Sequence, residues 1–335
     1  MQHGNTEFGR SGASRHDLPG PWRHRFALFT LAATLFLIFA GGMVTSTGSG
    51  LSVPDWPLSY GEFFPPMVGG VFYEHGHRMV AATVGLLMLA LAVWTWLSEG
   101  RRWVRRLATV ALATVVAQAI LGGITVIYLL PTEVSVAHAG LANLFCCMMV
   151  VLAVVTGRGW LQPRRSPRDP MPGALRRLKL LAVATTVAVY TQILLGAVMR
   201  HTQSGLAIPD FPLSLGRIIP PLGDPQVAIH FAHRAWAMVV LAVAAVTVAR
   251  ALRRHRDTPD LVRPAVALSV LLVAQVLLGA FSVWTAKAAV ITTFHVVGGS
   301  ISLAVALILT LRVARRHATW PDPLMAGSLA AEGTA

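Results

Sequence analysis

The chain has 335 residues, of which 55% are hydrophobic and only 13% are charged. Soluble domains carry roughly 25% charged residues, so this composition is typical of a membrane protein. The formal net charge is +14, but the basic residues stand in short clusters between apolar runs, where they act as topology signals. We therefore predict a lipid bilayer around the protein and no nucleic-acid partner. The two cysteines, Cys146 and Cys147, are adjacent in an apolar run, so their side chains diverge and we interpret them as core residues.

The segment before the first apolar run, residues 1–24, is polar and rich in arginine. It lacks the short apolar region and the cleavage site of a signal peptide, so we predict a disordered cytoplasmic tail. Residues 313–335 form a second predicted cytoplasmic tail.

Eight apolar runs of spanning length follow the first tail, at 25–46, 76–97, 107–128, 134–156, 178–199, 230–249, 264–285 and 290–311. A hydrocarbon core about 30 Å thick needs about 20 helical residues, so we predict an all-α polytopic membrane protein with eight transmembrane helices.

The connections between these helices place 23 of the 28 Lys and Arg residues on one side of the membrane. The positive-inside rule makes that side cytoplasmic, with both termini there and the protein in the cell inner (plasma) membrane. Two long loops, 47–73 and 200–229, face outward.

The two long loops are copies of one another. A shift of 155 residues places TSTGSGLSVPDWPLSYGEFFPP (45–66) on RHTQSGLAIPDFPLSLGRIIPP (200–221), and AQAILGG (117–123) matches AQVLLGA (274–280) at a shift of 157. We predict a tandem duplication of a four-helix bundle, with an N-terminal half (25–156), a cytoplasmic linker (157–177) and a C-terminal half (178–312). Four helices return the chain to its starting side, so the halves are expected to share a pseudo-twofold axis along the membrane normal.

Each loop carries an aspartate and an aromatic residue at matching positions. Asp55 and Asp210 either cap short interfacial helices or bind partners, and the structural role is favoured because a non-helical segment over a bundle needs tight turns. Trp56 and Phe211 fit interfacial aromatic anchors.

Histidine provides the candidate ligands, with twelve in the chain. Five lie in predicted cytoplasmic segments and are expected to be solvated: His3, His16, His24, His255 and His317. The other seven are His75, His77, His138, His201, His230, His233 and His295. Four of these form two equivalent pairs near the outer ends of helices, His77 with His138 and His233 with His295. Two facing histidines per bundle suit the axial ligation of haem iron. The alternative is a structural hydrogen bond of each histidine that was duplicated with the repeat. Zinc or copper sites normally recruit further ligands.

Charged residues near these pairs differ between the halves. Arg78 and Arg234 follow a histidine in each half, and they either pair with haem propionates or snorkel to the interface. Glu74 lies three residues before His77 and therefore on the same helix face, whereas His230 occupies this place in the second half. A carboxylate beside only one pocket indicates one pocket for chemistry and one for electron supply, and a loop carboxylate just outside the membrane is the alternative. His75 is about 200° around the helix from His77 and is not expected to share its site.

The sequence resembles the haem A synthase family over about residues 25–312. The resemblance rests on TGSGLSVPDWPLSYG (47–61), Glu74, His77, Arg78, His138, QSGLAIPDFPLSLG (203–216), His233, Arg234 and His295. It implies that His233 and His295 hold a haem b cofactor, and that haem O, the substrate, binds near His77 and His138. Glu74 matches the family's catalytic carboxylate.

Two departures from the family pattern lie in the outer loops. Many members have a cysteine pair there, but Val53, Ser59, Ile208 and Ser214 stand in this chain. The chain therefore resembles the cysteine-free subgroup. The arginine before the first Thr-Gly-Ser-Gly is Thr45 here, although Arg200 keeps the matching place in the second half.

The resemblance implies oxidation of the haem O methyl group by two successive hydroxylations, after which the gem-diol loses water to give the formyl group of haem A. Haem O synthase and an electron donor are then expected partners, and the protein is expected either as a monomer or as a homo-oligomer. The alternative is a bis-histidine dihaem cytochrome that only carries electrons. A transporter with parallel repeats is disfavoured, because the ionisable residues cluster at the outer ends and not at the midplane.

Overall fold

The computed structural model describes residues 21–161 and 172–318, and over these residues it is built from helices and loops. The long helices are α1 (Pro21–Ser46), α2 (Gly70–Ser98), α3 (Arg102–Ile127), α4 (Thr132–Thr156), α6 (Pro172–His201), α7 (Pro225–Arg254), α8 (Pro259–Trp284) and α9 (Ala289–Ala318). Two short helices, α5 (Arg158–Leu161) and η2 (Ser204–Leu206), lie in the connections. All eight long helices are long and apolar enough to cross a membrane. The prediction of an all-α protein with eight spans is confirmed for the described residues.

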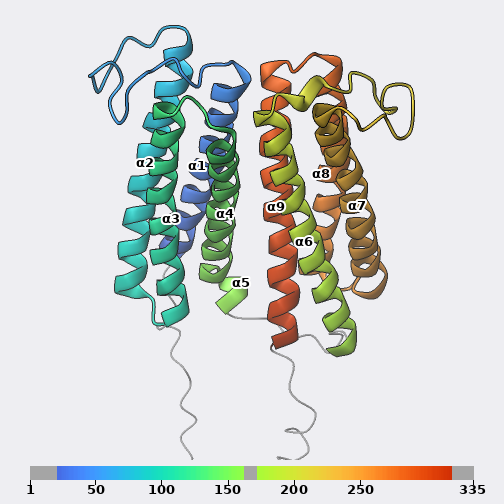
Figure 1. Ribbon diagram of the computed structural model, residues 1–335. Helices are drawn as coiled ribbons and strands as arrows, with labels where there is room; N and C mark the ends of the chain where they lie inside the picture. The colour runs from blue at the N-terminus through green and yellow to red at the C-terminus, as the bar shows by residue number, and fades with distance from the viewer. Residues whose placement is uncertain (1–20, 162–171, 319–335) are drawn as a thin grey trace, which may run out of the picture.

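The long helices form two bundles that stand side by side, with the long loops at one end (Figure 1). In the first bundle, α1 packs against α2 and α4, and α3 packs between α2 and α4. In the second, α6 packs against α7 and α9, and α8 packs between α7 and α9. Neighbours therefore follow a ring in each bundle, and α2 stands diagonally across from α4 as α7 does from α9. Residues on these diagonal helices face one another across the bundle interior.

The bundles meet through α1 on α9, α4 on α6 and α4 on α9. At the buried centre of this interface Ser300 Oγ donates to Asn143 Oδ1 at 2.8 Å. These two residues are repeat equivalents, since they follow His295 and His138 by the same number of positions. Equivalent residues meet in this way beside a twofold axis, which supports the expected pseudo-twofold arrangement. The axis itself stays a prediction.

Several helices begin earlier than hydropathy predicts. The outer ends of α2 and α7 lie at Gly70 and Pro225, before the expected 76 and 230. The extra turns hold polar residues that the outer loops hydrogen-bond, so the helix continues where apolar character alone would end it. The first span also begins earlier, at its inner end: α1 starts at Pro21, inside the predicted tail. The remaining parts of the tails and linker, 1–20, 162–171 and 319–335, lie outside the described residues.

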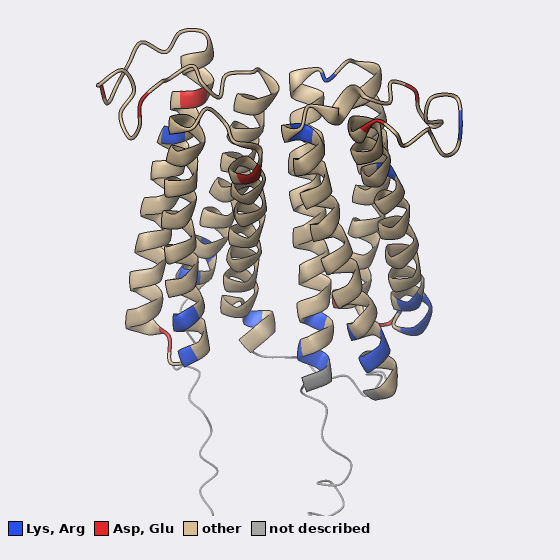
Figure 2. Ribbon diagram, in the orientation of Figure 1, with Lys and Arg blue, Asp and Glu red and all other residues tan. Residues whose placement is uncertain are grey.

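Lys and Arg residues gather at the ends of the bundles opposite the long loops (Figure 2). At this end Arg23, which is only 2% exposed, donates from Nη2 to Glu99 Oε2 at 2.8 Å. Arg101 also donates to both oxygens of Glu99, from Nε and Nη2. Burial raises the pKa of Glu99, but the hydrogen bonds and charge of Arg101 and the charge of Arg23 outweigh it and lower the pKa to about 2. The first bundle is therefore closed at this end by a carboxylate held between two guanidinium groups.

Two histidines at the same end are predicted to be solvated. His24 Nδ1 lies 2.9 Å from the carbonyl oxygen of Ala153, and His255 is only 2% exposed with no partner for either ring nitrogen among the described residues. The prediction of solvation is wrong for His255, because packing between helices covers a position that the sequence places in a short polar connection, whereas His24 is partly exposed. His3, His16 and the side chain of His317 lie outside the described part. Cys146 is buried and Cys147 is half-buried, and both are free thiols, which confirms their interpretation as core residues.

Candidate functional site

The second-half histidine pair faces across its bundle from the diagonal helices α7 and α9. The ring centroids of His233 and His295 are 6.5 Å apart, and the ring planes cross at 77°. A metal–nitrogen bond is about 2 Å long, so an iron atom between two imidazoles separates their centroids by roughly 6 Å. The observed spacing therefore fits two axial ligands of one haem.

Each of the four paired histidines lies against a glycine of a neighbouring helix. A Cβ added at the glycine would come close to the Cε1 atom of the ring, at 2.9 Å for Gly41 and His77, 3.0 Å for Gly196 and His233, 3.3 Å for Gly279 and His295, and 3.5 Å for Gly122 and His138. A Cβ at Gly41 or Gly196 would push the ring away from its place, a Cβ at Gly279 would require a small shift, and the distance at Gly122 is that of an ordinary contact. Sequence reasoning missed these glycines, although the repeats that contain them, such as AQAILGG, carried the signal.

The ring nitrogens of these histidines are unevenly covered. The Nδ1 atoms of His77, His138 and His295 are buried without a hydrogen-bond partner in the described part of the chain. All three residues are partly exposed, and their Nε2 atoms, unlike Nδ1, are not among the buried atoms without a partner, so Nε2 is the accessible ring nitrogen. An accessible Nε2 on a ring that is held by packing is what ligation of a metal requires. The unpaired rings therefore fit haem iron as their partner.

Glutamine side chains fix the backbone beneath one histidine in each half. Gln118 of α3 donates from Nε2 to the carbonyl oxygen of His138 at 3.0 Å. Gln192 of α6 does the same for His233 at 3.1 Å. These bonds tie the histidine-bearing helices to their neighbours and so limit movement of the rings.

Glu74 lies in α2 and is 4% exposed, so the alternative of a loop carboxylate is wrong. Its Oε2 accepts from the backbone N–H of Val53 at 2.9 Å, and its Oε1 accepts from Nη2 of Arg78 at 2.7 Å. Arg78 also donates from Nη1 to the carbonyl oxygens of Asp55 and Leu58. Glu74 and Arg78 together hold the first outer loop against α2. Each carboxylate oxygen keeps a second lone pair for a further donor.

The second half repeats this arrangement with an imidazole in place of the carboxylate. The backbone N–H of Ile208 points to Nδ1 of His230 at 3.2 Å, and Nε of Arg234 points to its Nε2 at 3.1 Å. A neutral imidazole has only one acceptor nitrogen, so His230 cannot satisfy both donors, whereas a carboxylate can. The two halves therefore share one scaffold here, but only the first has a carboxylate side chain at its centre.

The arginines are largely occupied by the loops. Arg234 donates from Nη1 to the carbonyl oxygens of Asp210 and Leu213 and from Nη2 to that of Ile208. Arg78 makes the corresponding contacts in the first half. Propionate binding by these two residues stays a prediction.

The loop aspartates have a structural role. Asp55 accepts from the backbone N–H groups of Tyr60 and Gly61, at 2.7 and 2.8 Å. Asp210 accepts from those of Leu215 and Gly216 at the same distances. These backbone hydrogen bonds lower the pKa of both aspartates. Each aspartate therefore stays ionised and closes the turn that follows it.

The remaining outer histidines, His75 and His201, hydrogen-bond groups outside the two histidine pairs. His75 Nδ1 is 2.8 Å from Ser59 Oγ, which agrees with the expectation that His75 does not share the site of His77. The carbonyl oxygen of His201 accepts from Thr132 Oγ1 at 3.4 Å. Both contacts join separate structural elements.

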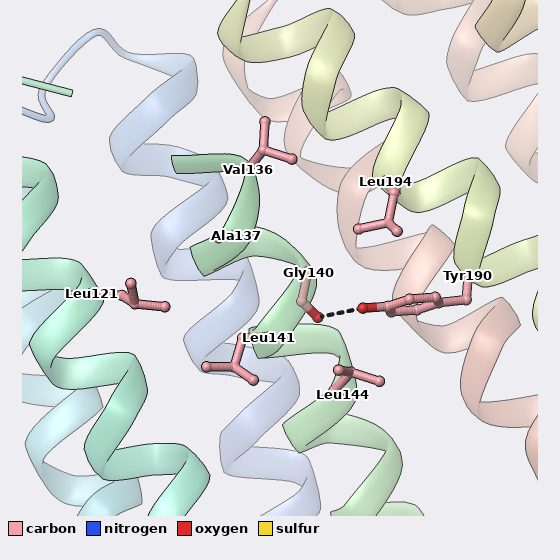
Figure 3. Close-up of a pocket in the computed structure, with 8 residues that line it drawn as sticks. All are labelled: Leu121, Val136, Ala137, Gly140, Leu141, Leu144, Tyr190 and Leu194. Carbon is pink, nitrogen blue, oxygen red and sulfur yellow. Dashed lines mark hydrogen bonds between the residues drawn. The ribbon is translucent and has the colours of Figure 1, made fainter. Parts of the chain in front are cut away.

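A pocket of about 320 Å³ lies between the bundles, beside the helix that carries His138 (Figure 3). Leu121 of α3 and Leu141 of α4 form one wall, and Leu194 of α6 forms the other. The hydroxyl group of Tyr190, which donates to the Gly140 carbonyl oxygen at 3.3 Å, is already paired. The walls are otherwise apolar, so the pocket suits hydrocarbon.

Comparison with known proteins agrees with this arrangement. The sequence model of the family described as cytochrome oxidase assembly protein (COX15-CtaA) matches residues 24–308. A protein of Symbiobacterium thermophilum named heme A synthase is 36% identical over 265 residues, which cover 76% of this chain and 83% of the relative. A protein of Alkalihalophilus pseudofirmus with the same name is 26% identical over 87% of this chain and 97% of its own length. The match spans both bundles and all four paired histidines, and the chain belongs to the cytochrome oxidase assembly protein family that includes the haem A synthases.

Proposed function

We propose that this protein is a haem A synthase, which oxidises a methyl group of haem O to the formyl group of haem A for terminal oxidases. The observation that carries the proposal is a duplicated pair of diagonal histidines with a carboxylate beside only the first pair. Two haem sites in one chain suit a protein that binds one haem as cofactor and another as substrate. The names of the relatives support the same activity.

In this proposal, His233 and His295 hold the haem b cofactor. Their centroid separation of 6.5 Å and the glycines at their rings support this assignment. When bound, that haem supplies one-electron redox chemistry, while the protein supplies position and dryness. The buried residues Leu268 and Leu272 of α8 belong to the apolar packing of this bundle, which keeps water away from the cofactor.

His77 and His138 hold the substrate haem O, with Glu74 near its reacting methyl group. Glu74 acts there as a proton acceptor or stabilises a developing cation. The ion pair with Arg78 fixes the carboxylate in place, and its free lone pairs remain available to accept a proton. The same ion pair keeps the loop closed over α2, which excludes water from the outer end of the site.

The orientation in the membrane follows from charge. Lys and Arg gather at the bundle ends opposite the long loops (Figure 2), and the positive-inside rule places those ends in the cytoplasm. Both termini are then cytoplasmic, and the paired histidines lie toward the outer face of the cell inner (plasma) membrane. Haem O synthase and an electron donor are the partners that the reaction needs.

The experiment that tests the function is expression with a supply of haem O, followed by chromatography of the extracted haems. We expect haem A together with haem B from the unaltered protein. A dihaem cytochrome that only carries electrons would yield unchanged haem O, and this result would overturn the proposal.

Variants of neighbouring residues separate chemistry from loop attachment. Glu74→Gln keeps a side chain of the same size but removes the negative charge, and we expect conversion to fall by about 10²-fold or more with haem still bound. His75→Gln is the matched control, because His75 holds the same loop through Ser59 but lies on another helix face. Full conversion by Glu74→Gln, or an equal loss in His75→Gln, would remove the chemical role of Glu74.

A further inference from the structure

One face of α6 is turned toward the second-half histidine pair. Gln192 holds the backbone carbonyl group of His233, and Gly196 lies against its ring. Residues four apart share a helix face, so Arg200 lies on this same face, one turn closer to the outer surface. Its side chain is partly buried.

Arg200 stands where three helices from both bundles meet. Its Nη2 donates to the Gly42 carbonyl oxygen at 2.9 Å and to Ser46 Oγ at 2.6 Å, both in α1. Ser46 Oγ lies 3.0 Å from Thr293 Oγ1 in α9, two residues before His295. The guanidinium group is therefore held beside the second site by its position on α6 and by its hydrogen bonds to α1, which in turn contacts α9.

No carboxylate in the described part of the chain balances the guanidinium charge of Arg200. Within residues 21–161 and 172–318, the ion pairs involve other arginines, and no carboxylate pairs with Arg200. Its two partners are a carbonyl oxygen and a hydroxyl group, which hydrogen-bond the guanidinium but leave its charge uncompensated. A cation in such surroundings is costly unless an anion joins it. Haem carries two anionic propionate groups, and a bidentate guanidinium suits a carboxylate.

The first half lacks this cation. The equivalent face of α1 carries Leu37, Gly41 and Thr45, at the same spacing of four residues, and Gly41 lies against the ring of His77. Thr45 Oγ1 donates to its own helix, at the Gly41 carbonyl oxygen. The two faces thus match at the glycine that contacts the histidine, but one ends in a charged residue and the other in a neutral one.

We propose that Arg200 binds a propionate of the haem held by His233 and His295, and that its absence from the first site lets the haem there exchange. This inference rests on the proposed function, in which one haem stays as cofactor and the other leaves as product. A charge-assisted hydrogen bond present at only one site gives the two haems different residence times without changing their iron ligands.

The test measures haem dissociation from the full-length, haem-loaded protein into an excess of apomyoglobin, followed by absorption. Arg200→Gln is expected to release the second-half haem about tenfold to a hundredfold faster, because a charge-assisted bond is lost. Arg200→Lys keeps the charge without the bidentate geometry, so its rate should lie between those of Arg200→Gln and the unaltered protein. Thr45→Arg is expected to slow release from the first site.

Ser46→Ala is the matched control, because it removes a partner of Arg200 in α1 and leaves the cation in place. If Arg200 only joined the bundles, Ser46→Ala and Arg200→Gln would change haem release alike, and the inference would be overturned. Unchanged release by Arg200→Gln would also overturn it. Unaltered protein that retains haem B but never converts haem O would instead refute the proposed function.

Discussion

The two halves place the same donors around different acceptors at the outer ends of α2 and α7. A loop N–H group and an arginine meet the carboxylate of Glu74 in the first half and the imidazole of His230 in the second. The glycines that contact the paired histidines are kept in both halves. Duplication thus preserved the scaffold that positions the rings, while the charges beside the rings diverged.

The inner ends of α2 and α7 also differ by a carboxylate in the first half and an imidazole in the second. The residue that follows α2 is Glu99, whose carboxylate is held between two arginines, and the residue that follows α7 is His255, which is buried without a partner in the described part. Arg200 adds the opposite charge to the second site, where the first half has Thr45. At these equivalent positions, therefore, the first half has a carboxylate or a neutral residue, and the second half has an imidazole or a guanidinium group.

The largest effect is expected from making the first half like the second. Glu74→His copies the second-half residue and removes the carboxylate, so we expect conversion of haem O to fall by about 10²-fold or more. The loop stays attached through one of its two donors, as it is at His230. The measurement is haem chromatography, and haem content at the first site is the control. Conversion that persists in Glu74→His would show that the two halves do not differ in chemistry at this position.

A graded series of glycine substitutions compares the four ring contacts. Each Gly→Ala change adds a Cβ beside a ring, and we expect the loss of haem affinity to follow the contact distances, greatest at Gly41 and Gly196, smaller at Gly279 and least at Gly122. Alanine favours a helix by about 1 kcal/mol over glycine, so these variants need not lose stability with haem affinity. Titration of each variant with haem gives the order. Equal affinities across the series would contradict the ring contacts.

The stabilities contributed by the inner ends of the two halves are expected to depend differently on pH. The pKa of Glu99 is lowered to about 2 from its ordinary 4.5, so its stabilisation is complete above pH 4.5 and is lost as the pH falls toward 2. Glu99→Gln is therefore expected to lower the melting temperature at pH 7 and to approach the unaltered protein in acid. Thermal unfolding in detergent checks this, and a deficit that stays constant down to pH 3 would contradict it.

The second bundle is expected to respond at a different pH. Burial, then the charges of Arg250 and Arg316, lower the pKa of His255 below its ordinary 6.5. The unfolded chain then binds the proton more readily, so His255 costs stability as the pH falls below 6.5. His255→Gln should gain melting temperature relative to the unaltered protein at pH 5 but not at pH 8. The same difference at both pH values would show that His255 does not titrate in this range.

The smallest effect is expected at the contact between the halves. Ser300→Ala removes the donor to Asn143 Oδ1 in the buried interface, and one lost hydrogen bond costs about 1–2 kcal/mol. Calorimetry in detergent should show a small decrease in melting temperature with a single transition. Two separated transitions would indicate bundles that unfold independently.

The sequence was sufficient for the features that depend on local pattern. Hydropathy located the eight spans, the repeat identified the bundles, and the repeat also singled out the four paired histidines from among twelve. The structural role expected for Asp55 is confirmed, although Asp55 closes a turn and does not cap an interfacial helix.

Features that depend on contacts between distant segments were missed. The bond from Val53 to Glu74 joins a loop to a helix, and the burial of His255 needs neighbours from other helices. The position of Arg200 against α1 requires the packing of one bundle on the other. None of these contacts leaves a periodic trace in the chain, so only the folded arrangement reveals them.

The difference between the halves is tested most directly by the haem that the protein retains after purification without haem O. His233→Ala and His295→Ala are predicted to abolish the absorption of this resident haem, and His77→Ala and His138→Ala are predicted to keep it. Loss of the resident haem in the first-half variants, with its retention in the second-half variants, would contradict the assignment of cofactor and substrate to the two bundles.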